Sequence, residues 1–141
     1  MKIAAKYAQY TNFDGTPEGF AHKSDLLREH CAAVGTDFDA IVRSANYNVA
    51  IGRTEAEVQE RLETLRARLE PLVGGADAAD ASLNAFRGGM PAVGTPPEQI
   101  VENLTALKKQ GLGYAIFYFP EAAYDTSGIE LLEKEVLPHL A

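Results

Sequence analysis

The sequence predicts an α/β fold in which parallel strands alternate with crossover helices. The chain has 141 residues, which is about the length of one domain. Segments with a helical spacing of apolar residues alternate with short segments rich in strand-forming residues. The segment 113–119 is a continuous apolar run, typical of a parallel strand that is covered on both faces. Together these observations predict one domain over 1–141 with three strands, at 10–13, 41–51 and 113–119.

The composition excludes several classes of function. Thirteen Lys and Arg residues against twenty Asp and Glu residues give a formal net charge of −7. A nucleic-acid or anionic-membrane surface needs a basic face, so we expect neither partner. There is no apolar run of ~20 residues that would span a membrane. The lone Cys31 fits a reducing cytoplasm, and the three widely spaced histidines offer no metal-ligand cluster.

The first elements have clear boundaries. Residues 2–9 are typical of the end of an Ala-rich helix, and 10–13 is a short run of strand formers that Asp14-Gly15 ends. Thr16 is suited to capping the next helix, and Pro17 suits its first position because no N–H is needed there. Gly35 then provides the left-handed residue that ends this helix.

The strand predicted at 41–51 has two different faces. Its β-branched residues and mixed period argue against a helix. On alternation, one face is small and polar and the other is apolar apart from Arg43. The polar face carries Val42, Ser44, Asn46, Asn48 and Ala50, and the apolar face carries Ile41, Ala45, Tyr47, Val49 and Ile51. Buried polar groups need partners, so the polar face is a candidate site.

The second half of the chain repeats the pattern of capped helices. Thr54 and Glu57 form a capping box, and Gly74 ends the Leu-rich helix that follows. Residues 76–94 are rich in Ala, Gly and Asp, and we expect a mobile excursion there with about one helical turn. Another capping box, 95–98, opens a helix that Gly111 ends, and Ser127 with Glu130 is the capping box expected for the last helix.

Several motifs taken in order resemble the C-terminal end of the luciferase-like monooxygenase family. Val-Gly-Thr-Pro-Pro-Glu-Gln-Ile at 93–100 is close to the family's Gly-Thr-Pro-Glu-Gln-Val helix start. Residues 111–114 lead into the last strand, and 129–139 ends in the Glu-Val-Leu-Pro pattern of the closing helix. Upstream, 4–8 and Asn12-Phe13 are similar to the helix and strand that follow the family's Gly-Gly loop. The tyrosine-rich last strand looks most like the deazaflavin-using branch.

This resemblance implies a fold and a cofactor. Family members are (β/α)₈ TIM barrels that use FMN or a deazaflavin, coenzyme F-420. A whole barrel needs ~250 residues, so the chain would form a partial TIM barrel containing the last three strands. The family's phosphate loop lies upstream of Met1, and we therefore expect a companion chain, a second copy or preceding residues to complete the barrel.

The implied function is that of the C-terminal part of a flavin- or deazaflavin-dependent oxidoreductase. It would carry hydride transfer to or from a small organic substrate, and we expect no catalysis by this chain alone. No catalytic residue is singled out. The alternative is a non-catalytic partial barrel that self-associates or completes a partner protein through its open sheet edges.

The candidate cofactor-binding residues follow the rule that barrel sites gather at the C-terminal ends of strands. Asn12 can hydrogen-bond a cofactor or substrate, or it is an ordinary turn residue. Asn46 and Asn48, with Ser44, can meet a ring system, or they form a self-satisfied polar layer in the barrel core.

Two further places are candidates on this reasoning. Gly94 and Thr95 precede a helix start, which favours anions such as a phosphate, although a plain capping box explains Thr95 equally well. Tyr118 and its aromatic neighbours can flank the planar ring of a flavin, or they belong to the core of the barrel.

Overall fold

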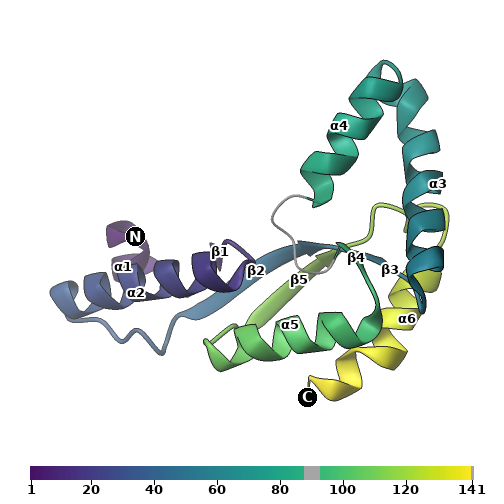
Figure 1. The fold of residues 1–141 in the computed structure, drawn as a ribbon. Coiled ribbons are helices and arrows are strands. Elements are labelled where there is room, and N and C mark those ends of the chain that lie inside the picture. The colour runs from purple at the N-terminus through teal and green to yellow at the C-terminus, as the bar shows by residue number, and fades with distance from the viewer. Residues whose placement is uncertain (88–92, 141) are drawn as a thin grey trace. The chain divides into compact units, whose positions relative to one another are not determined.

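The computed structural model describes residues 1–87 and 93–140, and for residues 86, 87 and 93–95 it describes the backbone. Six helices and five strands lie in the described part (Figure 1). The helices are α1 (Lys2–Tyr7), α2 (Pro17–Val34), α3 (Glu55–Val73), α4 (Ala76–Arg87), α5 (Pro97–Lys109) and α6 (Ser127–Glu135), followed by a 3₁₀ turn at Leu137–His139. The strands are β1 (Tyr10–Phe13), β2 (Val42–Asn48), β3 (Ala50–Ile51), β4 (Val93–Thr95) and β5 (Tyr114–Tyr118).

The strands form parallel sheets, as the alternation of elements predicts. One sheet has the order β1-β2-β5, and a second pairs β3 with β4. β1 runs parallel to β2 with Tyr10 opposite Val42 and Asn12 opposite Ser44, and β3 runs parallel to β4. The chain divides into two compact units. Unit 1 comprises Met1–Asn46 with Thr105–Ile116, and unit 2 comprises Tyr47–Leu104 with Phe117–Ala141.

In unit 1, one face of the β1–β2 pair is covered and the other is open. Thr11 and Phe13 are buried, and the Phe13 ring meets Phe20 of α2 edge-on at a centroid distance of 5.5 Å. Tyr10 and Asn12 alternate with them and are exposed. Because side chains alternate along a strand, Val42, Ser44 and Asn46 of β2 lie on the same side as Asn12. We call the side formed by Tyr10, Asn12, Val42, Ser44 and Asn46 the open face.

The boundaries of α2 confirm the predicted capping. The Thr16 hydroxyl accepts a hydrogen bond from the Gly19 N–H at 3.1 Å, and Pro17 occupies the first helical position. Gly35 ends the helix with φ of +74°, a left-handed conformation that favours glycine. The helical spacing also predicts one apolar face with Phe20, Leu27, Cys31 and Val34. The first three are buried, whereas Val34 at the end of the helix is 45 % exposed.

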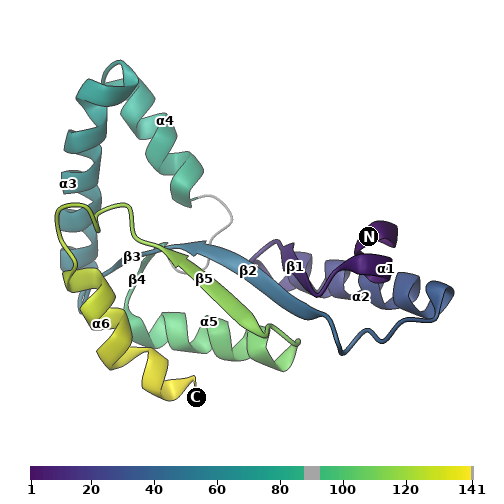
Figure 2. The same cartoon turned by 180° about the vertical axis from the view of Figure 1, so that it is seen from behind.

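In unit 2, α3 and α4 form a hairpin, and its α3 helix packs on the short strands β3 and β4 (Figure 2). Gly74 and Gly75, both at positive φ, make the turn between the two helices. A core cluster joins Ala50, Val58, Leu62 and Leu83, with Leu65 and Leu69 packed against it. Arg66 of α3 also forms an ion pair with Asp80 of α4. The helical spacing of Val58, Leu62, Leu65, Leu69 and Leu72 predicts one apolar stripe, but Leu72 is exposed at the end of α3.

Several expectations from the sequence are wrong. Residues 76–94 contain a helix of 12 residues, Ala76–Arg87, rather than about one turn. The remainder of that segment at 88–92 lies outside the described residues. The structure also has a strand that the sequence did not predict, β4. The strand predicted at 41–51 is interrupted at Val49, which divides it into β2 and β3. The Val49 N–H there donates to the carbonyl of Tyr118 at 2.8 Å.

The last strand and the last helix also differ from expectation. No residue of β5 is buried, and its end residues Tyr114 and Tyr118 are 55 % and 51 % exposed. The prediction that both faces of this strand are covered is therefore wrong for this chain. Thr126 precedes α6 without a side-chain cap, and Asp125 accepts the Ser127 N–H at 2.9 Å in place of the predicted capping box.

Candidate functional site

The Asn12 side chain links both strands of the open face. Its Nδ2 donates to Ser44 Oγ at 3.1 Å and to Asn46 Oδ1 at 2.8 Å. Ser44 Oγ in turn donates to the Thr11 carbonyl at 2.9 Å. These contacts follow from the register, since Asn12 lies opposite Ser44 and Asn46 is the next residue on the same side. We call Asn12, Ser44 and Asn46 the amide network.

Part of the amide network remains available to a ligand. Ser44 is buried beneath the two amides, whereas Asn12 is exposed and Asn46 is half-buried. Among residues 1–87 and 93–140, nothing hydrogen-bonds the Asn12 Oδ1 acceptor or the Asn46 Nδ2 donor. The open face thus offers one neutral acceptor and one neutral donor, which suit a ring edge carrying N–H and C=O groups. Ser44 fits the self-satisfied layer, and the two asparagines keep free capacity.

Asn48 and Tyr118 belong to unit 2, whereas the amide network belongs to unit 1. Asn48 ends β2 and is half-buried, and Tyr118 ends β5 with half of its surface exposed. The bond from the Val49 N–H to the Tyr118 carbonyl places the end of β5 beside the end of β2. The Phe117 ring contacts the Tyr47 ring, so alternation directs Tyr118 to the other side of the strand.

Gly94 and Thr95 lie in β4, where Thr95 is opposite Ile51. The side chain of Thr95 is outside the described part, so its predicted capping contact stays a prediction. The first turn of α5 begins with Pro97, which has no N–H, and includes the carboxylate of Glu98. Both features disfavour an anion, because a helix start attracts phosphate through free N–H groups and positive charge.

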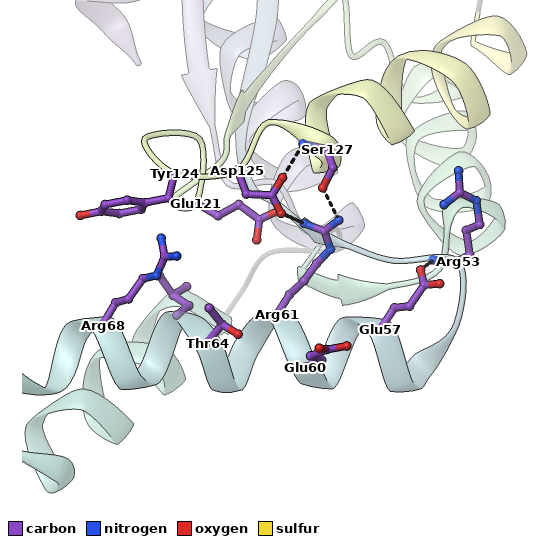
Figure 3. A pocket seen from close by; sticks show the side chains of 11 residues that line it. Arg53, Glu57, Glu60, Arg61, Thr64, Arg68, Glu121, Tyr124, Asp125 and Ser127 are labelled. Atoms are coloured by element: carbon purple, nitrogen blue, oxygen red, sulfur yellow. Dashed lines mark hydrogen bonds and ion pairs between the residues drawn. The ribbon is translucent and has the colours of Figure 1, made fainter.

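A cleft of about 420 Å³ lies between α3 and the loop that joins β5 to α6 (Figure 3). Its α3 side is one helix face, and its other side is the loop that follows the C-terminal end of β5. The lining residues are Arg53, Glu57, Glu60, Arg61, Thr64, Leu65, Arg68, Glu121, Tyr124, Asp125 and Ser127. In parallel α/β folds the C-terminal ends of strands are where binding sites gather, so the cleft is in the expected place.

Arg61 is the centre of this cleft. Its Nη1 lies 2.6 Å from Glu121 Oε1 and 3.3 Å from Asp125 Oδ2, and its Nη2 donates to Ser127 Oγ at 2.7 Å (Figure 3). The side chains of Arg61 and Glu121 are only 19 % and 14 % exposed. We call Arg61, Glu121, Asp125 and Ser127 the arginine cluster.

The pKa values of the two carboxyl groups in the arginine cluster are shifted in opposite directions. Burial raises the pKa of Glu121, and neighbouring Asp125 adds to this, while Arg61 opposes it. The pKa of Asp125 is lowered, first by hydrogen bonds from the backbone and hydroxyl of Ser127 and then by Arg61. Glu121 is therefore held by its partner against an unfavourable environment, whereas Asp125 is stabilised as an anion.

The ends of the cleft are ordered by separate contacts. Glu57 accepts the Arg53 N–H at 2.6 Å, while its own N–H donates to the Thr54 hydroxyl at 3.2 Å. The predicted capping function of Thr54 is therefore confirmed, with the reciprocal bond made to Arg53. At the other end, the Arg68 guanidinium lies 4.1 Å from the centre of the Tyr124 ring.

The sequence did not indicate the arginine cluster. Arg61 is 60 or more positions away from its three partners, and the four residues match no spacing motif. The one local signal is Asp125 two residues before Ser127, at the start of a helix. Within the described residues, no three His, Cys, Asp or Glu side chains are grouped to hold a metal ion. None of the helices in that part of the chain is both long and apolar enough to cross a membrane.

Comparison with known proteins gives a match in structure only. No protein-family profile and no curated protein matches the chain. A coenzyme F420-dependent tetrahydromethanopterin reductase from Methanopyrus kandleri matches with a TM-score of 0.66 and 18 % identity, over 99 % of this chain and 48 % of the reductase. An F420-dependent secondary alcohol dehydrogenase in complex with an F420-acetone adduct matches with a TM-score of 0.68 and 15 % identity, over 99 % and 45 % of the two chains.

A third similar structure is a riboflavin lyase with modified FMN and riboflavin. It has a TM-score of 0.67 and 16 % identity, over 99 % of this chain and 40 % of the lyase. The chain thus spans less than half the length of these proteins, and such identities establish the fold alone. All three are luciferase-like monooxygenase family members. The chain therefore has the predicted α/β fold of a partial TIM barrel, like that of proteins in the family its sequence resembles.

Proposed function

We propose that this chain forms one wall of the cofactor site in a luciferase-like oxidoreductase or monooxygenase that uses F420 or FMN. The observation that carries the proposal is the open face, where Asn12 Oδ1 and Asn46 Nδ2 are free beside a buried Ser44. The similar structures support it, because two are named as F420-dependent enzymes and one is named with modified FMN.

The residues of the open face fit the ring of such a cofactor. Flavin and deazaflavin rings have a polar edge of alternating C=O and N–H groups and a broad apolar surface. Asn46 Nδ2 can donate to a carbonyl of that edge, and Asn12 Oδ1 can accept from an N–H. Tyr118 and Asn48, which lie in unit 2, are separate cofactor-binding candidates, since an exposed phenol ring can pack against a planar system.

The chemistry itself would belong to the cofactor. When bound, a flavin or deazaflavin ring accepts or donates a hydride, and the protein orients it against a small organic substrate. The side chains of this wall are neutral amides and a phenol, so they would orient the ring without moving a proton. For the cofactor's phosphate, Gly94 and Thr95 remain candidates, although Pro97 and Glu98 in the next turn argue against an anion there.

The rest of the site would come from outside this chain. Because the chain spans less than half the length of the similar proteins, its activity and partners are part of the proposal. We propose that a companion chain, a second copy or a further segment completes the barrel, and that the chain is inactive alone. The free and buried Cys31 supports a reducing compartment such as the cytoplasm.

A titration followed by the intrinsic fluorescence anisotropy of F420 and of FMN tests the function. We expect saturable binding of one of them to the purified chain. Asn46→Asp keeps an oxygen for Asn12 Nδ2 but removes the donor Nδ2, so affinity should fall roughly fivefold. Asn84→Asp adds the same charge at an exposed position of α4 and should change little. Absence of binding at millimolar concentrations, or equal losses in both variants, would exclude this wall as a cofactor site.

A second candidate function has its own supporting observation. The strands carry large side chains that remain exposed, with Tyr10 at 64 %, Tyr114 at 55 % and Tyr118 at 51 %. Exposed apolar surface on strands favours association, so a non-catalytic partial barrel that self-associates is the alternative. Sedimentation of a colourless dimer that ignores both cofactors would support this alternative and argue against the first function.

A further inference from the structure

We infer that Arg61 is a positioning residue, which holds the loop after β5 in place and so fixes one wall of the cleft in unit 2. The inference rests on contacts within unit 2 and goes beyond the proposed function. The loop, residues 119–126, begins directly after Tyr118 and ends where α6 starts. Loops in this position carry the site residues of barrel enzymes, which makes their placement important.

The geometry of the guanidinium suits this task. Arg61 reaches three acceptors that all belong to the loop or the first residue of α6, at 2.6, 3.3 and 2.7 Å. A planar guanidinium can satisfy several acceptors in fixed directions, which a lysine ammonium cannot do in the same way. The acceptors are spread over seven residues, from Glu121 to Ser127, so one side chain orders the whole second half of the loop.

The loop is folded around Glu121 and Asp125, the two acidic residues that bind Arg61. The N–H groups of Tyr124 and Asp125 both donate to the Glu121 carbonyl, at 2.8 and 2.9 Å. Asp125 uses one carboxylate oxygen for Arg61 and the other for the Ser127 N–H. Each residue that accepts a hydrogen bond from Arg61 thus also takes part in a local backbone hydrogen bond, so loss of Arg61 would loosen the turn as a unit.

The glycine at the start of α6 is part of the same arrangement. A Cβ added at Gly128 would lie 2.6 Å from Glu121 Oε1, the atom that bonds Arg61. Only a residue without a side chain leaves room for the Glu121 carboxylate at this depth. The low exposure of both Arg61 and Glu121 means that water replaces their contact poorly.

Hydrogen exchange measured by mass spectrometry on the full chain tests the inference. In Arg61→Gln we expect amides of 120–128 to exchange roughly tenfold faster or more, because the loop opens locally. Arg66→Gln is the matched control on the same helix, since Arg66 pairs with Glu70 and Asp80 rather than with the loop. It should affect the α3–α4 hairpin and leave 120–128 unchanged. Unchanged loop exchange in Arg61→Gln, or equal effects in both variants, would overturn the inference.

A rescue experiment separates positioning from general stability. In Arg61→Gln the Glu121 carboxylate is left without its cation, so adding Glu121→Gln should restore part of the protection of 120–128. Arg61→Lys keeps the positive charge but lacks the planar guanidinium, so it should retain only part of the protection of 120–128. Additive damage in the double variant would contradict the inference.

The proposed function and this inference fail in different experiments. If the unmodified chain binds neither F420 nor FMN, the proposed function is contradicted, but the result of the exchange experiment does not change. Unchanged exchange of 120–128 in a folded Arg61→Gln chain overturns the inference and leaves the proposed function untouched.

Discussion

The amide network and the arginine cluster solve the same problem, the pairing of polar side chains beside a sheet, in opposite ways. The network in unit 1 uses neutral groups on an open face and leaves one donor and one acceptor free. The cluster in unit 2 is built on the ion pair of Arg61 with Glu121, at 19 % and 14 % exposure, and commits three of its members to Arg61. Neutral amides can exchange partners with a ligand at little cost, whereas a mostly buried ion pair resists separation. The network is therefore suited to binding and the cluster to holding structure.

The largest expected effect comes from Arg61→Ala. The substitution leaves Glu121 buried without a cation, in surroundings that already raise its pKa. We expect a loss of about 2–3 kcal/mol in the free energy of unfolding, somewhat below the cost of breaking a fully buried pair. Urea denaturation followed by circular dichroism measures it, with Arg28→Ala, whose exposed ion pair to Asp25 should be worth little, as control. Equal losses in the two variants would erase the distinction between buried and exposed pairs.

The next largest effect is expected for Gly128→Ala, which should lower the free energy of unfolding although alanine is the better helix former. Alanine is the better helix former by about 1 kcal/mol, yet its Cβ would displace Glu121 Oε1 from Arg61. We expect a net loss of about 1 kcal/mol. The same change in a Glu121→Ala background should be neutral or stabilising, since the obstructing atom is then absent. A stabilised single variant would show that the carboxylate is not held at this position.

Ser44→Ala should have a moderate effect of about 1 kcal/mol. It removes one acceptor of Asn12 and the donor to the Thr11 carbonyl, while the bond from Asn12 to Asn46 remains. Because all groups are neutral, the loss should be the same at low and high salt, as thermal unfolding at several ionic strengths would show. A salt-dependent loss would mean that the network is coupled to charge.

The smallest expected effect is the acid response of Asp125→Asn. A carboxyl with a lowered folded pKa stabilises the protein above its unfolded pKa, and this contribution disappears as pH falls through the folded pKa. The wild-type chain should thus lose this increment below about pH 4, and Asp125→Asn should lack it. Glu121, with its raised pKa, acts in the opposite sense, since stability falls as pH rises through its titration. Unfolding midpoints of the wild-type chain and Asp125→Asn, measured from pH 3 to 7, test the contribution of Asp125. Identical curves for these two proteins would contradict a lowered pKa of Asp125.

Local chemistry was predictable from the sequence, because its signals lie within a few residues. The caps at Thr16 and Thr54 and the glycine stops at Gly35 and Gly74 are of this kind. The two faces of β2 were also predictable, since alternation along a strand needs no knowledge of its neighbours. That Ile41, Ala45, Tyr47, Val49 and Ile51 are all buried confirms the apolar face.

The features that the sequence did not predict depend on distant contacts. α4 has few large apolar residues of its own and is stabilised by packing of Leu83 on the α3 core and by Asp80 on Arg66. The exposure of β5 reflects covering elements that this chain does not supply. Arg61 and Glu121 meet across 60 positions, and no local pattern marks either of them.

The central claim is that the open face of β1 and β2 binds a flavin or deazaflavin ring, and side-chain amide signals in a ¹⁵N NMR titration test it most directly. We predict that F420 or FMN shifts the Asn12 and Asn46 side-chain amides saturably. Signals of the arginine cluster should remain in place. Shifts absent from both asparagines at millimolar cofactor, or found only around Arg61, would contradict the account.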